Sequence, residues 1–151
     1  MRKFEVVKDF AIKYGVKDVQ LPTRGTKYAA AYDFYSPIDV VIEPHSKQMI
    51  FSNIKADMEE DEFLMLAPRS SMGKVDISIA CTVGIIDKDY YGNPNNDGNI
   101  GLFLKNNGDE PFVIKKGDRL VQGVFMKILL VENDIVVNQE RKGGFGSTDK
   151  K

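Results

Sequence analysis

Short apolar stretches recur along the chain, and each is bounded by Gly, Pro, Asn or Asp. Stretches of this kind, rich in β-branched and aromatic side chains, are typical of β-strands. Their regular spacing favours an all-β sandwich or barrel in which helices are minor. The predicted strands cover residues 4–7, 39–42, 48–54, 63–66, 77–82, 100–105, 111–114, 120–126 and 135–138.

Helical periodicity is nearly absent from the chain. No run of about 11 or more residues keeps apolar side chains at helical spacing, and the one short helix predicted covers Ser70–Val75, with Ser70 as its N-cap. The polar residues 132–134 lie between two apolar runs and predict a hairpin turn. No repeat interrupts the pattern, so the sequence predicts one domain over 1–138 and a Gly-rich C-terminal arm over 139–151.

The composition is that of a soluble globular protein, with 42% hydrophobic and 28% charged residues in a chain of 151. The net charge of −1, with both signs interspersed, gives no field that would recruit nucleic acid. No apolar run approaches the ~20 residues of a membrane span, and the charged N-terminus is unlike a secretion signal. We therefore expect a cytoplasmic protein that binds neither nucleic acid nor membrane.

Cysteine and histidine each occur once, as Cys81 and His45. A single cysteine excludes an intrachain disulfide and a multi-cysteine metal site. A thiol nucleophile needs a histidine nearby, but His45 lies between Pro and Ser in a turn pattern. The residues themselves therefore predict a buried, inert Cys81 rather than a catalytic Cys–His pair.

The segment Val83–Gly92 places two carboxylates, Asp87 and Asp89, two residues apart after an apolar run. In an extended strand, residues i and i+2 point to the same side. Both carboxylates would then face one pocket, while Ile86 and Lys88 would face away. A carboxylate at a pocket wall can activate water. The alternative is a strand end with solvated acids and a tight glycine turn.

A second polar group follows Pro68, where Arg69, Ser70 and Ser71 lie at a strand end. An arginine fork beside two hydroxyls and free backbone amides is suited to binding phosphate. The alternative is a capped surface turn with a solvated arginine.

Two more polar positions lie in or near apolar strands. Arg119 and Gln122 would face opposite sides of a regular strand, so at most one of them would face a given pocket. Gln122 is the stronger candidate, because a buried amide must find hydrogen-bond partners. Asp33 lies between aromatic residues, either as a carboxylate that a packed strand delivers to a polar site or as a structural turn residue before Pro37.

The C-terminal segment Gly143–Thr148 is glycine-rich with one aromatic residue. Glycine lets backbone N–H groups approach a polyphosphate, Phe145 could lie over a base, and Ser147 and Thr148 could donate hydrogen bonds. The segment is not a P-loop, because no lysine follows the glycines at the required position. The alternative is a disordered terminus.

Taken in order from Leu21 to Thr148, these segments resemble the five motifs of the homotrimeric dUTPases, of which bacterial and phage members come closest in length. The chain also carries the sequence LPTRG at Leu21–Gly25. Each motif alone is weak, but five in the right order are specific. The resemblance implies a distorted jelly-roll β fold with one short helix. It also implies a homotrimer whose active sites each draw on all three subunits, with a mobile C-terminal arm closing over the nucleotide.

The resemblance further implies Mg²⁺-assisted hydrolysis of dUTP to dUMP and pyrophosphate, which limits uracil in DNA and supplies dUMP for thymidylate synthesis. Asp87 would orient and deprotonate the water that attacks the α-phosphorus. Tyr90 would lie under the deoxyribose and disfavour a 2′-hydroxyl. Asp33 would act near the metal through water, with no direct protein ligand expected.

Two further sets of residues follow from the resemblance. The phosphate-binding set comprises Arg69, Ser70, Ser71, Gln122, Arg141, Gly144, Phe145, Gly146, Ser147 and Thr148. The set around deoxyribose and uracil comprises, besides Tyr90, the residues Cys81, Gly84, Ile86, Asn99, Ile100 and Gly101.

The chain departs from the family pattern at a few positions. A turn-rich loop, Asn93–Gly98, stands where relatives continue directly into a strand. Cys81 occupies a position where many relatives have Asn, and Ala31 stands where Gly is common. If the chain is phage-encoded, the inserted loop is a natural contact for a regulatory protein partner.

Two other functions stay open at this stage. The first is dCTP deaminase, an enzyme of the same fold whose relatives carry a Glu on the strand after the third motif. Phe103 stands at that position here, and no acid occurs from residue 100 to 106. The second is a β-sandwich binding module, for which the ordered motifs would be coincidental. Ammonia release from dCTP and pyrophosphate release from dUTP separate the two enzymes.

Overall fold

The computed structural model describes residues 1–138 and 141, and within them the chain folds mainly into β-strands. The one α-helix of the described part is a single turn, α1 (Ser70–Gly73). The all-β class that the hydrophobic pattern predicts is confirmed. The other elements are β1 (Lys3–Val6), η1 (Asp9–Ala11), β2 (Tyr32–Tyr35), β3 (Val40–Ile42), β4 (Lys47–Phe51), β5 (Ile54–Asp57), β6 (Glu62–Pro68), β7 (Ile77–Ile79), β8 (Gly84–Asp87), η2 (Lys88–Tyr90), β9 (Gly101–Asn106), β10 (Phe112–Ile114) and β11 (Arg119–Lys127), where η marks a 3-10 helix.

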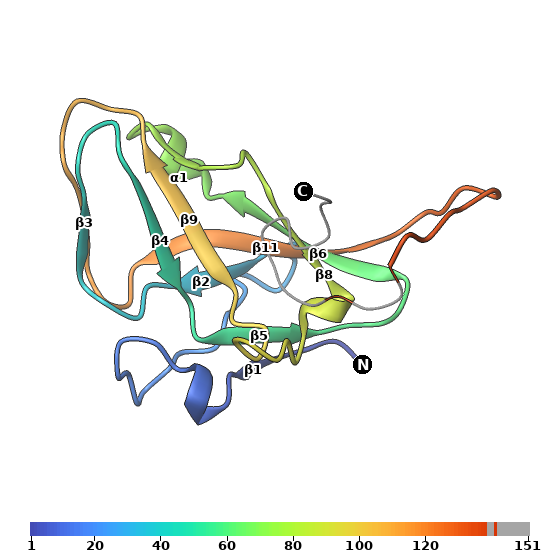
Figure 1. Cartoon of the computed structure of the whole chain (residues 1–151). Helices are drawn as coiled ribbons and strands as arrows, with labels where there is room; N and C mark the ends of the chain where they lie inside the picture. Colours follow the sequence, from blue (N-terminus) through green and yellow to red (C-terminus); the bar gives the residue numbers. More distant parts are fainter. Residues whose placement is uncertain (139–140, 142–151) are drawn as a thin grey trace.

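The strands pair in antiparallel sheets. A four-stranded sheet has the order β2-β11-β6-β8, and a three-stranded sheet has the order β4-β9-β7. Two short ribbons, β1-β5 and β10-β3, complete the pairing. Figure 1 shows the β1-β5 ribbon along one side of the molecule, next to the N-terminus. In this order β8 is an edge strand, so one of its sides is left without a strand neighbour.

One apolar cluster joins the two larger sheets. Phe34, Leu64 and Val121 enter it from the four-stranded sheet, and Ile50 and Leu102 from the three-stranded sheet. Each of these side chains is at most 1% exposed. Burying a side chain of this size typically stabilises the fold by ~1.5–3 kcal/mol. The cluster therefore fixes the sheets that form the walls of the site described below.

The predicted strand 48–54 is in fact two strands, β4 and β5, separated at Ser52 and Asn53. Asn53 has a φ of 63°, a conformation that interrupts a strand. Its buried side chain accepts a hydrogen bond from the Lys13 backbone N–H at 2.8 Å and donates one to the Lys13 carbonyl at 3.1 Å. The break therefore ties the sheet to the N-terminal segment.

The predicted cap of the short helix is also wrong. Arg69, with φ −71° and ψ 150°, occupies the N-cap position, and no side-chain hydrogen bond caps the helix. Ser70 is already helical, because the extended backbone of β6, which runs two residues beyond the predicted strand, ends at Arg69. The predicted strand 77–82 likewise ends at Ile79, since Thr82 has a φ of 74°.

Residues 128–138 leave the body of the molecule as an extended arm, drawn in red in Figure 1. A turn lies at Glu132 and Asn133, within the predicted 132–134. The predicted strand 135–138 is wrong, because this segment has no strand partner in the described part of the chain. Its apolar side chains are exposed, with Ile135 at 84% and Leu129 across the turn at 93%.

Candidate active site

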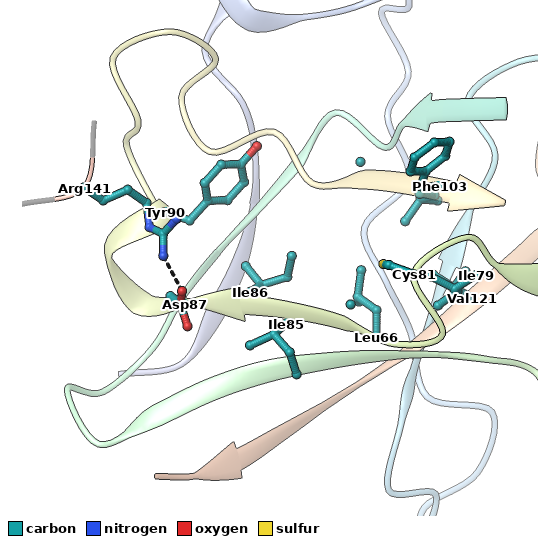
Figure 2. A pocket seen from close by; sticks show the side chains of 13 residues that line it. Leu66, Ile79, Cys81, Ile85, Ile86, Asp87, Tyr90, Phe103, Val121 and Arg141 are labelled. Carbon is teal, nitrogen blue, oxygen red and sulfur yellow. Dashed lines mark hydrogen bonds and ion pairs between the residues drawn. The ribbon is translucent and has the colours of Figure 1, made fainter. Parts of the chain in front are cut away.

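A pocket of about 330 Å³ lies beside the edge strand β8, between it and β9. Its walls are mostly apolar, and its polar groups are few. Figure 2 shows Asp87, Tyr90 and Arg141 at one end and Cys81 and Phe103 toward the other. The lining residues are Leu66, Ile79, Cys81, Gly84, Ile85, Ile86, Asp87, Tyr90, Gly101, Leu102, Phe103, Val121 and Arg141.

Asp87 is the last residue of β8, and the chain then turns into the 3-10 helix η2. The extended geometry assumed for Asp87 and Asp89 is therefore wrong beyond Asp87, and Asp89 does not line the pocket. Ile86, which an extended strand would turn away, does line it, because the pocket opens at the edge of the sheet. The two carboxylates nevertheless converge on one cation: Arg141 donates through Nη2 to Asp87 and through Nε to Asp89, the latter at 2.8 Å.

Tyr90 is 7% exposed, and its hydroxyl is held by two partners. The hydroxyl donates to the Asn99 carbonyl at 2.8 Å and accepts from Nδ2 of Asn96 at 2.8 Å. Burial raises the pKa of Tyr90 above its ordinary value, and the hydrogen bond from Asn96 offsets part of that rise. In Figure 2 the hydroxyl points away from Asp87, so the ring forms part of the pocket wall.

Cys81 lines the pocket and is exposed, so the prediction of a buried cysteine is wrong. The reason is a tight turn after β7. The Val83 N–H donates to the Cys81 carbonyl at 2.9 Å around Thr82, which has a φ of 74°. This is a γ-turn, a strained conformation for a β-branched residue. It turns the chain outward at the pocket and carries the Cys81 side chain with it.

Glycines let the pocket walls approach closely. A Cβ on Gly84 would lie 3.0 Å from the Leu66 Cβ, its partner across β6 and β8. Gly101 also lines the pocket. Asn99 and Ile100 do not line it, since both are 0% exposed. The Asn99 side chain instead bonds to Asn53 and to the backbone of the N-terminal segment.

A second polar cluster centres on Asp33, a residue of β2 that is 9% exposed. Arg69 donates through Nε to Asp33 at 3.0 Å, and its Nη1 lies 3.4 Å from the Ser71 hydroxyl. Nη1 of Arg119 lies 3.7 Å from the other Asp33 oxygen. The carboxylate thus holds two guanidinium groups at the end of β6, beside the exposed Ser70.

Arg119 and Gln122 do not face opposite sides, which corrects the prediction from a regular strand. The register against β2 shifts between Arg119 and Val121, so Arg119 is opposite Tyr35 and Gln122 is opposite Asp33. A separation of two residues on β2 thus corresponds to a separation of three residues on β11, which is the effect of a β-bulge. Gln122 donates to the Pro68 carbonyl at 3.1 Å.

The structure therefore divides the predicted site residues into two groups. Cys81, Gly84, Ile86, Asp87, Tyr90, Gly101 and Arg141 line the pocket, whereas Asp33, Arg69, Ser70, Ser71, Asn99, Ile100 and Gln122 do not. Five predicted residues of the C-terminal arm 139–151 lie outside the described residues: Gly144, Phe145, Gly146, Ser147 and Thr148.

Sequence reasoning missed two contributors to the site. Asn96 holds Tyr90, but it belongs to the inserted loop and nothing in its sequence context marks it. Arg119, the weaker candidate of the pair from the sequence, carries the charge that lies near Asp33. A basic residue directly after a Gly–Asp turn, opposite an acidic strand, is the pattern from which Arg119 could have been proposed.

Within residues 1–138 and 141, no three His, Cys, Asp or Glu side chains group closely enough to hold a metal ion. No helix in the same part is long and apolar enough to cross a membrane.

The fold and the pocket define an all-β protein with an apolar pocket beside a carboxylate. Residues 17–149 match the dUTPase family model, and the chain belongs to this family. A Lactococcus lactis deoxyuridine 5′-triphosphate nucleotidohydrolase is 41% identical over 150 residues, covering 98% of this chain and 97% of the relative.

Solved structures agree with this assignment. The dUTPase from Streptococcus mutans is 36% identical and superposes with a TM-score of 0.75 over 86% of this chain and 98% of its own. A D95N mutant dUTPase from phage phi11 of S. aureus is 23% identical, with a TM-score of 0.70 over 93% and 99%. That second structure, which coordinates a structural Mg(II) ion, supports the fold alone. With these neighbours, the jelly-roll β fold that the resemblance implies is confirmed.

Proposed function

We propose that the protein hydrolyses dUTP to dUMP and pyrophosphate, with Asp87 as the base that activates the attacking water. One observation carries this proposal: a partly exposed carboxylate lies at the polar end of an otherwise apolar pocket. The Asp87 side chain is 48% exposed, so water can contact it while the apolar walls hold a base and sugar. The Lactococcus lactis relative, a deoxyuridine 5′-triphosphate nucleotidohydrolase by name, supports the choice of nucleotide.

The nucleoside is proposed to enter the pocket between β8 and β9. The volume and the apolar lining of this pocket suit a small planar ligand. Backbone groups at Gly84 and Gly101 are accessible, since neither residue carries a side chain that would cover them. The Tyr90 ring would lie against the deoxyribose and leave no room for a 2′-hydroxyl.

The phosphates are proposed to bind the cluster around Arg69. Its guanidinium and the hydroxyls of Ser70 and Ser71 would contact phosphate oxygens, and Gln122 would contribute from β11. Gly144, Phe145, Gly146, Ser147 and Thr148 would complete the phosphate site as a lid, as the family resemblance implies.

Magnesium fits these residues as an ion held through the phosphates. The Asp33 carboxylate is already paired with Arg69 and lies near Arg119, so it suits contact through water better than direct ligation. Mg²⁺ keeps several waters and commonly binds through substrate phosphates. When bound, it would neutralise charge on the triphosphate.

Arg141 is proposed to exchange partners during the reaction. In the described structure its guanidinium is held by Asp87 and Asp89. A triphosphate offers stronger bidentate acceptors for the same fork. Moving to the phosphates would free the Asp87 carboxylate to accept a proton from water.

A homotrimer is proposed as the active assembly. No residue of the Arg69 cluster lines the pocket, which supports sites built from more than one subunit. The arm 128–138 exposes six large apolar residues, from Leu129 to Val137, that a neighbouring subunit would cover. We also propose that the protein acts in the cytoplasm, and a regulatory protein partner stays a prediction.

Pyrophosphate release from dUTP, dCTP and UTP tests the proposed function. We expect an appreciable rate of pyrophosphate release from dUTP alone among the three nucleotides. We expect no ammonia from dCTP, because Phe103 lines the pocket where a deaminase would carry an acid. Ammonia release from dCTP would reject the proposal in favour of the deaminase.

A further inference from the structure

The inserted loop Asn93–Gly98 is a compact turn folded back on the segment that carries Tyr90. The Asn93 N–H donates to the Tyr90 carbonyl at 3.1 Å, and the Asp97 N–H donates to the Asn93 carbonyl at 2.7 Å. Gly98 has a φ of 82°, and a Cβ at this position would lie 2.6 Å from the Tyr90 carbonyl oxygen. Only glycine permits this approach.

The loop is also fixed to the body of the protein. The Asp97 carboxylate accepts from Nζ of Lys55 and from the Lys8 backbone N–H, both at 2.8 Å. The side chains of Lys55 and Asp97 are 8% and 3% exposed. A buried ion pair of this kind holds the loop in one position relative to β5. The loop therefore offers little free surface to a partner, with Pro94 and Asn95 as its exposed residues next to the turn.

One side chain connects this fixed loop to the pocket. Asn96 accepts from the Gly98 N–H through Oδ1 at 3.0 Å and donates through Nδ2 to the Tyr90 hydroxyl at 2.8 Å. The Tyr90 hydroxyl in turn donates a hydrogen bond to the Asn99 carbonyl. Two hydrogen bonds to its hydroxyl thus fix the orientation of the Tyr90 ring, and one of them comes from the loop.

We propose that Asn96 is a positioning residue for Tyr90 and that the inserted loop sets how strongly the enzyme rejects a ribonucleotide. The inference rests on the proposed function, in which the Tyr90 ring lies against the deoxyribose. Without the Asn96 amide, one of the two bonds that fix the ring is lost. The ring can then tilt away from the pocket and make room for a 2′-hydroxyl.

Two substitutions separate this role from a general loss of structure. Asn96→Asp keeps an acceptor for the Gly98 N–H but offers no donor to the Tyr90 hydroxyl, whereas Asn96→Ala removes both contacts. Asn107→Ala is the matched control, because Nδ2 of Asn107 also donates to a hydroxyl, that of Ser78 at 2.9 Å, and neither residue lines the pocket. Melting temperatures are recorded for all three variants.

The readout is the ratio of kcat/KM for dUTP to kcat/KM for UTP. We expect both Asn96 variants to lower this ratio by roughly 3- to 10-fold, the effect of one lost hydrogen bond. Tyr90→Phe should lower it as well, and adding Asn96→Ala to Tyr90→Phe should lower it no further, because the two act through one contact. Asn107→Ala should keep the ratio of the unmodified protein.

The outcomes are distinct. An unchanged ratio in both Asn96 variants, with dUTP still hydrolysed, overturns the positioning role and leaves the proposed function intact. An equal fall in Asn107→Ala also overturns it, since the effect would then be general. If the unmodified protein releases no pyrophosphate from dUTP, the proposed function fails and the inference fails with it.

Discussion

Arg141 pairs with Asp87 across 54 residues of chain, and the same guanidinium binds Asp89. The Arg141 side chain is 18% exposed, whereas the Asp87 side chain is 48% exposed. The carboxylate that we propose as the base is therefore paired with a cation that is less exposed to solvent than the carboxylate is. This arrangement links the proposed base to Arg141 of the C-terminal arm.

Replacing Asp87 by Asn should lower kcat for dUTP by ~10²- to 10⁴-fold, because an amide cannot accept the proton of the attacking water. Stability should change little, since Asp87 is half-exposed. Asp89→Asn is the matched control, because it also loses a contact to Arg141 but does not line the pocket. Equal losses of kcat in both variants would show that the contact to Arg141, rather than the base, is what matters.

Arg141→Lys should lower kcat/KM for dUTP by roughly 10-fold. Lysine keeps the charge but loses the fork that binds two acceptors at once. Arg2→Lys provides the comparison, because Arg2 binds the Glu62 carboxylate at 2.6 Å outside the pocket. Steady-state kinetics of both variants check this, and full activity of Arg141→Lys would exclude a bidentate role.

Gly98→Ala should destabilise the protein by ~2–4 kcal/mol, because its Cβ would lie 2.6 Å from the Tyr90 carbonyl oxygen at a φ of 82°. Gly92→Ala has a similar φ of 74° but no atom within 4 Å of its Cβ, so ~1 kcal/mol is expected. Urea denaturation of both variants measures the difference. Similar losses would mean that the loop does not press on Tyr90.

Lys55→Met should destabilise the protein by ~3–5 kcal/mol, because it leaves the Asp97 carboxylate buried without its cation. Lys116→Met removes a lysine that also lies 2.8 Å from an aspartate, Asp18, but at the exposed surface. That control should cost less than ~1 kcal/mol. The free energies of unfolding of both variants are measured at neutral pH. A larger loss for Lys55→Met attributes the destabilisation to burial of the ion pair, whereas equal losses attribute it to charge pairing alone.

Tyr91 should ionise at a pH well above the ordinary tyrosine value. The hydrogen bond to Glu5 and partial burial raise the pKa of Tyr91 from 10.0 to about 12. The stability that this contact provides is complete below pH 10 and is lost as the pH rises from 10 to about 12.

Tyrosinate absorbance during alkaline titration measures this step. Glu5→Gln should bring it down toward the ordinary tyrosine value, and Tyr91→Phe should remove it. A step that persists unchanged in Tyr91→Phe would assign it to another tyrosine.

The strands were predictable where one face is buried. In β6 and β9 burial alternates from residue to residue, so the apolar pattern located both to within two residues. The arm 128–138 shows the limit of this logic. Its apolar residues have the composition of a strand, but a strand also needs a partner, and the described part of the chain supplies none.

The candidate site was predictable where one short segment supplies it. Asp87 and Tyr90 come from a single motif, and both line the pocket. The bulge at Arg119–Val121 was not predictable, because it depends on how β11 pairs with β2, far away in the sequence. The outward turn at Thr82, which exposes Cys81, was missed because no glycine marks it.

The N-terminal segment contacts the inserted loop and the residue after it through its backbone: the Lys8 N–H donates to the Asp97 carboxylate, and the Ala11 carbonyl accepts from the Asn99 side chain. The family match begins at residue 17, after all of these contacts. A chain shortened to the matched region would thus keep every motif while losing the contacts that brace the loop behind Tyr90.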